Sequence, residues 1–292
     1  MASEVTAKTT ARALTVLKEG LPQYSRTELE ALFTEGRVRY DGHRIKKSER
    51  ISEGGVLSVD ITDGAGITAN PAISLSIVFE DESIIAVNKP PFMHTVPLRH
   101  DDTDTLMNAV AAHCGKTPEA GGVLNAGSVN RLDHETTGLV LAAKSDQAFG
   151  TLSTTYRSER TEKYYLARVA GTPPGHMLME DVLVKERSGE KEKMRVGDVR
   201  GLRARAELTL LARCPDTMDE CYVLLRLITG VRHQLRVQLA SRGYPIVGDA
   251  LYGGRENTTM LLHSLIVETH HPESDRRIML CAVPPEMFWG DG

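Results

Sequence analysis

The stretch SVNRLDHETTGLVLAAKS, at residues 128–145, places an acidic residue shortly before a continuous apolar run. The run GLVLAA, at residues 138–143, begins with a glycine and is followed by a lysine, and this pattern predicts a short buried strand. Asp133 stands at the mouth of that strand, where a half-desolvated carboxylate costs free energy unless a cation pairs with it. The sequence should therefore contain a partner for Asp133, a purpose for it, or both.

A candidate partner lies in TGVRHQLRVQLASRG, at residues 229–243, which follows a predicted strand and which we predict to be a helix. Leu235 and Leu239 are four residues apart and share a face, and Arg232 and Arg236 fall within the same broad arc. Arginine on a buried stripe is unusual and requires a carboxylate, for which Asp133 is the obvious candidate. An ordinary structural ion pair remains the alternative interpretation.

The segment KYYLARVAG, at residues 163–171, has the alternation of a strand, so one of its two tyrosines faces inward and the other outward. The inward ring is either a core aromatic, which is the commoner case, or a ring presented to a ligand.

Composition limits the protein class. The 292 residues suggest about two domains, and 41% apolar with 25% charged residues is an ordinary globular balance. We expect no transmembrane helix and no signal peptide, because long apolar runs are missing. The four cysteines form no CxxC pair, which favours a reducing, cytoplasmic setting. No metal-ligand spacing and no Gly-rich phosphate loop is found, so we expect no metal and no cofactor.

The N-terminal segment, residues 10–62, is predicted to be a small domain in which a helix pair packs on a β-ribbon. A first helix carries Leu14 and Leu17, and a second begins at the capping box SRTE, residues 25–28, and ends at Gly36. Asp41-Gly42 predicts a tight hairpin turn, and VLSVDI, residues 56–61, a closing strand. Residues 63–72 are predicted to be a Gly/Ala linker.

A basic cluster lies in this segment. Six basic residues and two acids give a local net charge of +4, although the whole chain carries −4. Its basic members are Arg37, Arg39, Arg44, Lys46, Lys47 and Arg50. Taken alone, the cluster is best interpreted as a solvated charged face.

The remaining chain, residues 73–292, is predicted to be an α+β domain with a mixed, mostly antiparallel sheet and flanking helices. The predicted strands cover residues 76–80, 83–89, 138–143, 161–171, 202–213, 221–230 and 260–272. Helices are predicted at residues 103–115 and 145–159, the second with Ser145 as N-cap. The segment SGEKEKM, residues 188–194, is predicted to be a charged turn.

The stretch YSRTELEALFTEGRVRYDGHRIKKSERISEGGVLSV, residues 24–59, resembles the S-four RNA-binding domain of ribosomal proteins and some RNA-modifying enzymes. In that family the second helix and the following turn present basic residues to RNA phosphates. The resemblance implies an RNA-binding surface made of Arg37, Arg39, Arg44, Lys46 and Lys47.

From about residue 75 to the C-terminus the chain resembles the RluA-type RNA pseudouridine synthases. The resemblance rests on IVFEDESIIAVNKP, NRLDHETTGLVLAAKS, KYYLARVAG, TGVRHQLRVQLASRGYPIVGDALYG, and LLHS with HHP, in this order. It implies a pseudouridine synthase fold, RNA as the partner, a chain that acts as a monomer, and isomerisation of uridine in ribosomal or transfer RNA without a cofactor.

The resemblance also implies roles for individual residues. Asp133 would attack the anomeric carbon or act as a base there, Arg236 would keep it charged, and Tyr165 would stack on the uracil and take part in proton transfer. Leu262 would line the uracil pocket. Further residues expected to bind substrate are Arg131, Leu132, Arg232 and His233.

Three positions depart from the family pattern. Many members have histidine where this chain has Asn130, arginine usually stands where Val231 does, and PPFMHTVP lacks the glycine common after Lys-Pro. An alternative function is an RNA-binding chaperone or assembly factor that retains the synthase fold. A deaminase is disfavoured because the zinc-ligand spacing is missing.

Overall fold

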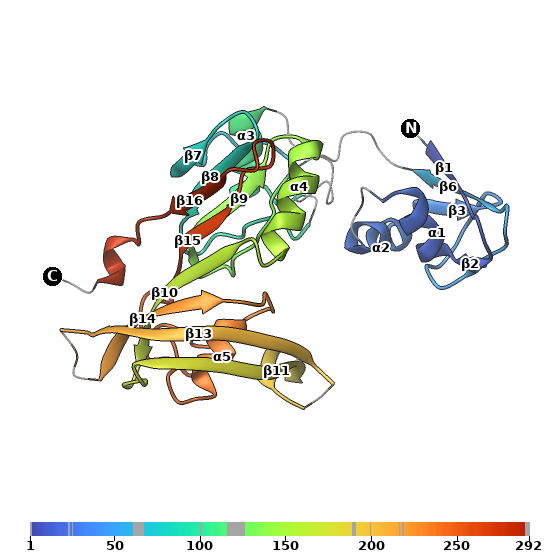
Figure 1. The fold of residues 1–292 in the computed structure, drawn as a ribbon. Helices are drawn as coiled ribbons and strands as arrows, with labels where there is room; N and C mark the ends of the chain where they lie inside the picture. Colours follow the sequence, from blue (N-terminus) through green and yellow to red (C-terminus); the bar gives the residue numbers. More distant parts are fainter. Residues whose placement is uncertain are drawn as a thin grey trace. The chain divides into compact units, whose positions relative to one another are not determined.

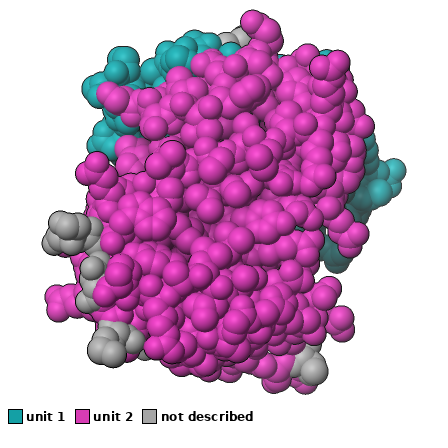
Figure 2. All heavy atoms as spheres, turned by 60° about the vertical axis from the view of Figure 1, so that its left-hand side comes forward, with its two compact units in different colours: residues 1–73, 96–128, 143–150 teal, residues 74–95, 129–142, 151–292 magenta. Residues whose placement is uncertain are grey.

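The computed structural model describes residues 2–22, 24, 26–60, 67–99, 101–115, 126–188, 191–198, 200–215, 217 and 219–289. The chain divides into two compact units, one of residues 1–73, 96–128 and 143–150 and one of residues 74–95, 129–142 and 151–292 (Figure 2). Across the described ranges, no helix combines the length and the apolar character needed to cross a membrane.

The N-terminal part of the first unit contains the predicted helix pair and a small sheet. Its elements are β1 (Ala2–Thr6), β2 (Ala11–Arg12), α1 (Ala13–Gly20), α2 (Arg26–Thr34), β3 (Val38–Tyr40), β4 (His43–Arg44), β5 (Arg50–Ile51) and β6 (Val56–Asp60). The sheet order is β1-β6-β3-β4, and β2 pairs with β5. Leu17, Leu29, Val38 and Leu57 are fully buried between the helices and the sheet. Ser25, the N-cap of the predicted capping box, lies outside the described residues, as does the side chain of Glu28, and β1 was not predicted.

The second unit is built on a large sheet (Figure 1). Its strands are β7 (Ile77–Glu80), β8 (Ile84–Lys89), β9 (Thr137–Ala143), β10 (Glu162–Ala170), β11 (His176–Ser188), β12 (Lys191–Val196), β13 (Leu202–Arg213), β14 (Glu220–Leu227), β15 (Leu262–His270) and β16 (Arg277–Cys281). The order is β12-β11-β13-β14-β10-β15-β9-β8-β7, and β16 pairs with β15. The β9–β15 pair is parallel, whereas β10 pairs antiparallel with both β14 and β15. The predicted mixed, mostly antiparallel sheet is confirmed.

The helices outside the N-terminal part are α3 (Leu106–Cys114), α4 (Asp146–Arg157) and α5 (Gln234–Ala240), and a short 3-10 helix covers Glu286–Phe288. The predicted N-cap of α4 is confirmed, since the Ala148 amide donates to the Ser145 hydroxyl at 3.2 Å. α5 packs its Val237 against Leu183, Met194 and Ala204 of the sheet.

Two predictions were wrong. The helix predicted for residues 229–243 begins only at Gln234, because the side-chain oxygen of Gln234 accepts hydrogen bonds from the Thr229 hydroxyl and the Val231 amide. Arg232 therefore does not share a helical face with Arg236. The predicted charged turn at residues 188–194 is strand from Lys191 onward, because Met194 is buried against α5 while its charged neighbours stay outside.

Candidate active site

Asp133 lies at the apex of a turn that runs back along β9. The Val129 amide donates to the Leu141 carbonyl at 2.9 Å. The side chain of Asn130 then bonds the backbone of β9, as a neighbouring strand would. Its oxygen accepts the Leu141 amide at 2.8 Å, and its nitrogen donates to the Leu139 carbonyl at 3.0 Å. These bonds fix the turn, and the Asp133 side chain remains 30% exposed.

Gly138 explains how β9 lies so close to β15. Its φ is +109°, and a Cβ at this position would lie 2.3 Å from the Ser264 carbonyl oxygen. Only glycine permits this approach. The glycine that begins the apolar run therefore sets the position of the strand that follows Asp133.

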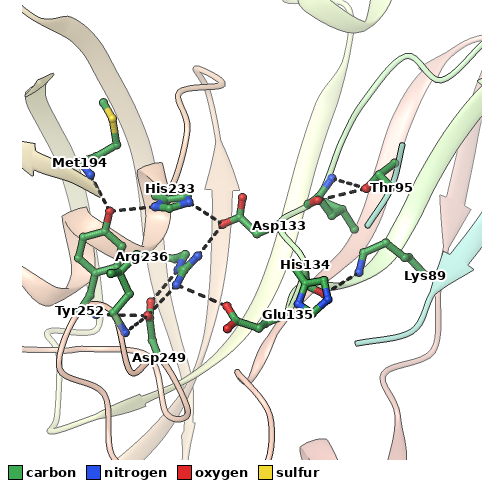
Figure 3. A network of polar contacts seen from close by, with 12 residues as sticks. Lys89, Thr95, Asp133, His134, Glu135, Met194, His233, Arg236, Asp249 and Tyr252 are labelled. Atoms are coloured by element: carbon green, nitrogen blue, oxygen red, sulfur yellow. Dashed lines mark hydrogen bonds and ion pairs between the residues drawn. The ribbon is translucent and has the colours of Figure 1, made fainter. Parts of the chain in front are cut away.

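Arg236 is the buried partner that the sequence predicted for Asp133. Its Nη1 donates to Asp133 Oδ2 at 2.8 Å (Figure 3). Its Nε and Nη2 donate to the two oxygens of Asp249, each at 2.8 Å, and the Asp249 side chain has no exposed surface. Burial opposes the guanidinium charge, but the hydrogen bonds and charges of Asp249 and Asp133 outweigh it and raise the pKa of Arg236.

His233 faces Asp133 from the residue before α5. Its Nε2 lies 3.7 Å from Asp133 Oδ2, and its Nδ1 lies 3.0 Å from the Tyr252 hydroxyl. The Tyr252 oxygen accepts the Met194 amide at 2.9 Å, and the described residues offer its own proton no acceptor other than His233 Nδ1. Burial lowers the pKa of His233, so the neutral ring carries its proton on Nε2, toward Asp133.

Lys89, the last residue of β8, is 1% exposed and approaches the same turn. Its ammonium donates to the carbonyls of Pro90 at 2.8 Å, Met93 at 2.9 Å and His134 at 3.2 Å. Burial lowers the pKa of Lys89 to about 8, although the charges of Asp133 and Glu135 act in the opposite direction. Lys89 thus ties the loop after β8 to the residue that follows Asp133.

Tyr165 is the inward-facing tyrosine of β10, as predicted, and is 8% exposed. Its neighbour Tyr164 is half-buried and donates to Glu162. Burial raises the pKa of Tyr165 to about 12, a hydrogen bond with Ser264 lowers it, and the negative charge of Asp133 raises it again. Tyr165 therefore stays protonated and lies within the electrostatic reach of Asp133.

The structure thus brings together Asp133, Arg236 and His233. Leu132 is buried, and its amide and carbonyl both bond the Thr95 hydroxyl at 3.1 Å. Leu262 is buried at the start of β15, whereas Arg131 and Arg232 are exposed on loops.

The sequence prediction missed Lys89, Asp249 and Tyr252. The signal for Asp249 was an acid inside the apolar stretch PIVGDALY, residues 245–252, and the signal for Lys89 was a lysine that ends an apolar strand.

The basic cluster near the N-terminus extends from Arg37, just before β3, to Arg50 on β5. Arg39 and Arg44 are exposed and directly opposite each other in the β3–β4 pair. Lys46 is exposed, Lys47 pairs with Glu30 at 2.8 Å, and the half-buried Arg37 pairs with Glu35 at 3.2 Å. Two of the five predicted RNA-binding residues thus have carboxylate partners.

The chain is similar to known proteins. A family model described as RNA pseudouridylate synthase matches residues 83–241, more than half of the chain. Ribosomal large subunit pseudouridine synthase D of Pseudomonas aeruginosa is 30% identical over 284 residues, covering 91% of this chain and 86% of that protein. The protein of the same name from Zymomonas mobilis is 34% identical over 230 residues, covering 73% and 70%.

A solved structure, Human RNA Pseudouridylate Synthase Domain Containing 1, shares the fold with a TM-score of 0.60 at 24% identity, covering 73% of this chain and 84% of that one. The resemblance to pseudouridine synthases is thereby confirmed. The chain belongs to the RNA pseudouridylate synthase family and is an isomerase that acts on RNA.

Proposed function

We propose that this enzyme converts uridines of large-subunit ribosomal RNA to pseudouridine, with Asp133 as the reacting group. The observation that carries the assignment is the Asp133 carboxylate, which is hydrogen-bonded to the buried Arg236. The Asp133 side chain is still 30% exposed, so a ribose could reach it. The names of the Pseudomonas and Zymomonas relatives favour ribosomal over transfer RNA.

Asp133 supplies the chemistry through its free oxygen. Arg236 occupies Oδ2, so Oδ1 can attack the anomeric carbon or take a proton from the sugar while the glycosidic bond breaks. The detached uracil then turns and rejoins through carbon, so no group donor is needed. The Arg236 guanidinium stabilises the charged carboxylate before the reaction starts.

Tyr165 and Leu262 would enclose the uracil. A protonated Tyr165 can stack on the base and donate or relay a proton near the ribose. The target base must leave its stack to reach these residues. Arg131 and Arg232, both exposed, would contact the phosphates on either side, and His233 would donate from Nε2 to Asp133 or to the sugar.

The N-terminal segment would bind RNA. Arginines directly opposite each other in a strand pair repel, and a phosphate between Arg39 and Arg44 would remove this repulsion. We propose residues 10–62 as an S-four-like RNA-binding domain, residues 63–72 as its linker and residues 73–292 as the catalytic domain. The proposal includes a monomer in the cytoplasm.

The decisive test is Asp133→Asn. Asparagine keeps the shape but can neither attack carbon nor act as a base, so we expect turnover to fall at least about a thousandfold, or ~4 kcal/mol. The fold should survive because Asp249 still pairs with Arg236. Pseudouridine is measured by mass spectrometry on unmodified large-subunit ribosomal RNA transcribed in vitro, with circular dichroism and RNA affinity as checks.

Glu135→Gln is the matched control, since it neutralises the neighbouring carboxylate, which lies 3.7 Å from Arg236. Turnover of Asp133→Asn within about tenfold of wild type, only ~1.4 kcal/mol, would remove Asp133 from the reaction. A chaperone that merely retains the fold would make no pseudouridine with either variant or with the wild type. Mapping pseudouridine in cells with and without the protein would identify the RNA and the uridine.

A further inference from the structure

Two exposed aromatic rings, those of Phe92 and His94, contact the exposed ring of His134 next to Asp133. Phe92 and His94 lie on the loop after β8, and His134 directly follows Asp133. The ring centroids of Phe92 and His134 are 6.0 Å apart, and those of His94 and His134 are 4.6 Å apart. The Phe92 side chain is 55% exposed, although a phenyl group normally gains stability by burial.

Phe92 also has a strained backbone. Its φ is +57°, in the left-handed region, which a bulky side chain adopts only as an outlier. Glycine would adopt this conformation without strain, yet the segment PPFMHTVP contains none. Neither burial nor local conformation accounts for a phenylalanine here, and such strained residues are concentrated at functional sites.

Hydrogen bonds fix the backbone of the two segments that carry these rings. The Lys89 ammonium donates to the carbonyls of Pro90, Met93 and His134, and the Met93 amide also donates to the His134 carbonyl at 3.2 Å. These bonds join the loop that carries Phe92 and His94 to the turn that carries Asp133 and His134. The backbone that carries the three rings is therefore held at a fixed position relative to Asp133.

We propose that Phe92, His94 and His134 form a stacking platform for a nucleobase next to the target uridine. This proposal rests on the proposed function, because a uridine that leaves its stack exposes the faces of its neighbours. Aromatic and imidazole rings are the groups on which proteins stack unpaired RNA bases. The platform lies beside the reacting carboxylate, so its occupant is a base of the same RNA.

The first test compares two substitutions of Phe92. Phe92→Gly removes the ring and relieves the strain, so we expect unchanged or higher stability against urea but a loss of about 5–150-fold in kcat/KM, which corresponds to ~1–3 kcal/mol of base stacking. Phe92→Trp keeps an aromatic face and should retain most of kcat/KM. The substrate is the unmodified large-subunit ribosomal RNA transcript.

Asp275→Gly is the matched control. Asp275 has φ +54° in the turn between β15 and β16, so glycine relieves the same kind of strain there. We expect kcat/KM to stay at the wild-type value. A purely structural role of Phe92 would change stability and leave kcat/KM unaltered, as in this control.

A second measurement does not depend on activity. The chain has one tryptophan, Trp289, so Phe92→Trp combined with Trp289→Phe places the single tryptophan on the platform. Addition of the transcript should quench its fluorescence, while Trp289 of the wild type should respond weakly.

Wild-type kcat/KM in Phe92→Gly, together with no quenching at position 92, would overturn the platform. A wild-type enzyme that makes no pseudouridine would instead overturn the proposed function, and the fluorescence measurement would then decide the platform separately.

Discussion

Arg236 shows how one side chain can be fixed by dividing its donors between two acids. Asp249 engages Nε and Nη2, and Asp133 receives Nη1. Asp249 also accepts the amides of Leu251 at 3.2 Å and Tyr252 at 3.3 Å, which anchors its carboxylate to the backbone. Asp249 therefore fixes the direction in which Nη1 points.

Asp249→Asn should separate positioning from chemistry. Asparagine can accept on its oxygen alone, because its amide nitrogen is a donor, so it cannot receive Nε and Nη2 side by side. We therefore expect the Arg236 plane to rotate and Asp133 to lose its orientation. We expect turnover to fall about tenfold or more, ~1.4 kcal/mol, with RNA affinity retained, and the free energy of unfolding to fall by about 3 kcal/mol. Single-turnover kinetics and urea unfolding measure the two effects.

Asp219→Asn is its control, because Asp219 pairs with Arg255 on the surface. This substitution should lower the free energy of unfolding by less than about 1 kcal/mol. Equal turnover in Asp249→Asn and wild type would show that Asp249 contributes to stability alone.

The sequence predicted Asp133 and Arg236 because both are charges set in apolar patterns, and a buried charge needs a partner. It could not predict that Arg236 would bond a second carboxylate, that of Asp249, as well as Asp133. Asp249 lies 116 positions after Asp133 in the chain, and the Arg236 fork that joins them is visible only once α5 and the loop before β15 are packed.

Strand β15 contains a fully buried histidine at its parallel junction with β9. His263 Nε2 donates to the Ala282 carbonyl at 3.0 Å, so Nδ1 accepts from the Thr137 hydroxyl at 2.8 Å. Burial lowers the pKa of His263 to about 4, while the Ala282 carbonyl acts in the opposite direction. The junction is thus built around a neutral imidazole.

The buried His263 should make the free energy of unfolding fall in acid. The unfolded chain binds a proton at His263 below a pKa of ~6.5, whereas the folded chain does so only below about 4. Stability is therefore full above ~6.5 and falls by about 3 kcal/mol as the pH drops to about 4. Urea unfolding across this range should show a steeper loss for wild type than for His263→Gln. Parallel curves would contradict the prediction.

The strands of the large sheet were predictable where they are apolar, as β9, β10 and β15 are. β12 was not, because Lys191, Lys193 and Arg195 dominate its composition and only Met194 and Val196 face α5. The first residue of α5 could not be predicted from the sequence either. His233, just before the helix, adopts φ +54° and contacts Tyr252. In both cases a tertiary contact decides against the local pattern.

At the scale of the whole molecule, part of the predicted linker is joined to the segment around α3. The Asn108 side chain is fully buried and donates to the Thr68 carbonyl at 2.7 Å. The Asn70 amide donates to the Asn108 carbonyl at 2.9 Å. Removal of the N-terminal segment must leave these residues in place.

A shortened chain that begins at Ile67 should therefore fold and retain turnover at saturating RNA, with weaker RNA binding. A chain that begins at Pro71 loses one of the two backbone carbonyls that accept from the buried Asn108 side-chain amide, which costs about 1–3 kcal/mol. Thermal unfolding compares the two, and filter binding compares each with the full chain. Equal RNA affinity of the Ile67 chain and the full chain would exclude an RNA-binding role for the N-terminal segment.

The basic pair on β3 and β4 gives a separate prediction. In the full chain, Arg39→Gln with Arg44→Gln should reduce the slope of log Kd against log salt by about 0.7–0.9 per charge removed, since each phosphate contact releases counterions. Lys8→Gln with Lys18→Gln removes two exposed charges from the same unit and serves as the control. Identical slopes in the two double variants would place the RNA elsewhere.

The second acid on Arg236 has a consequence for the charge balance over a catalytic cycle. In the proposed reaction, Asp133 ceases to be an anion, whether it forms an ester with the ribose or takes a proton. A guanidinium with Asp133 as its single partner would then be a buried, unpaired cation, and that cost would be added to the intermediate. Asp249 would still accept from Nε and Nη2 of Arg236 at that stage. In the proposed reaction, the intermediate would therefore form and break down without leaving Arg236 as a buried cation that lacks an acidic partner.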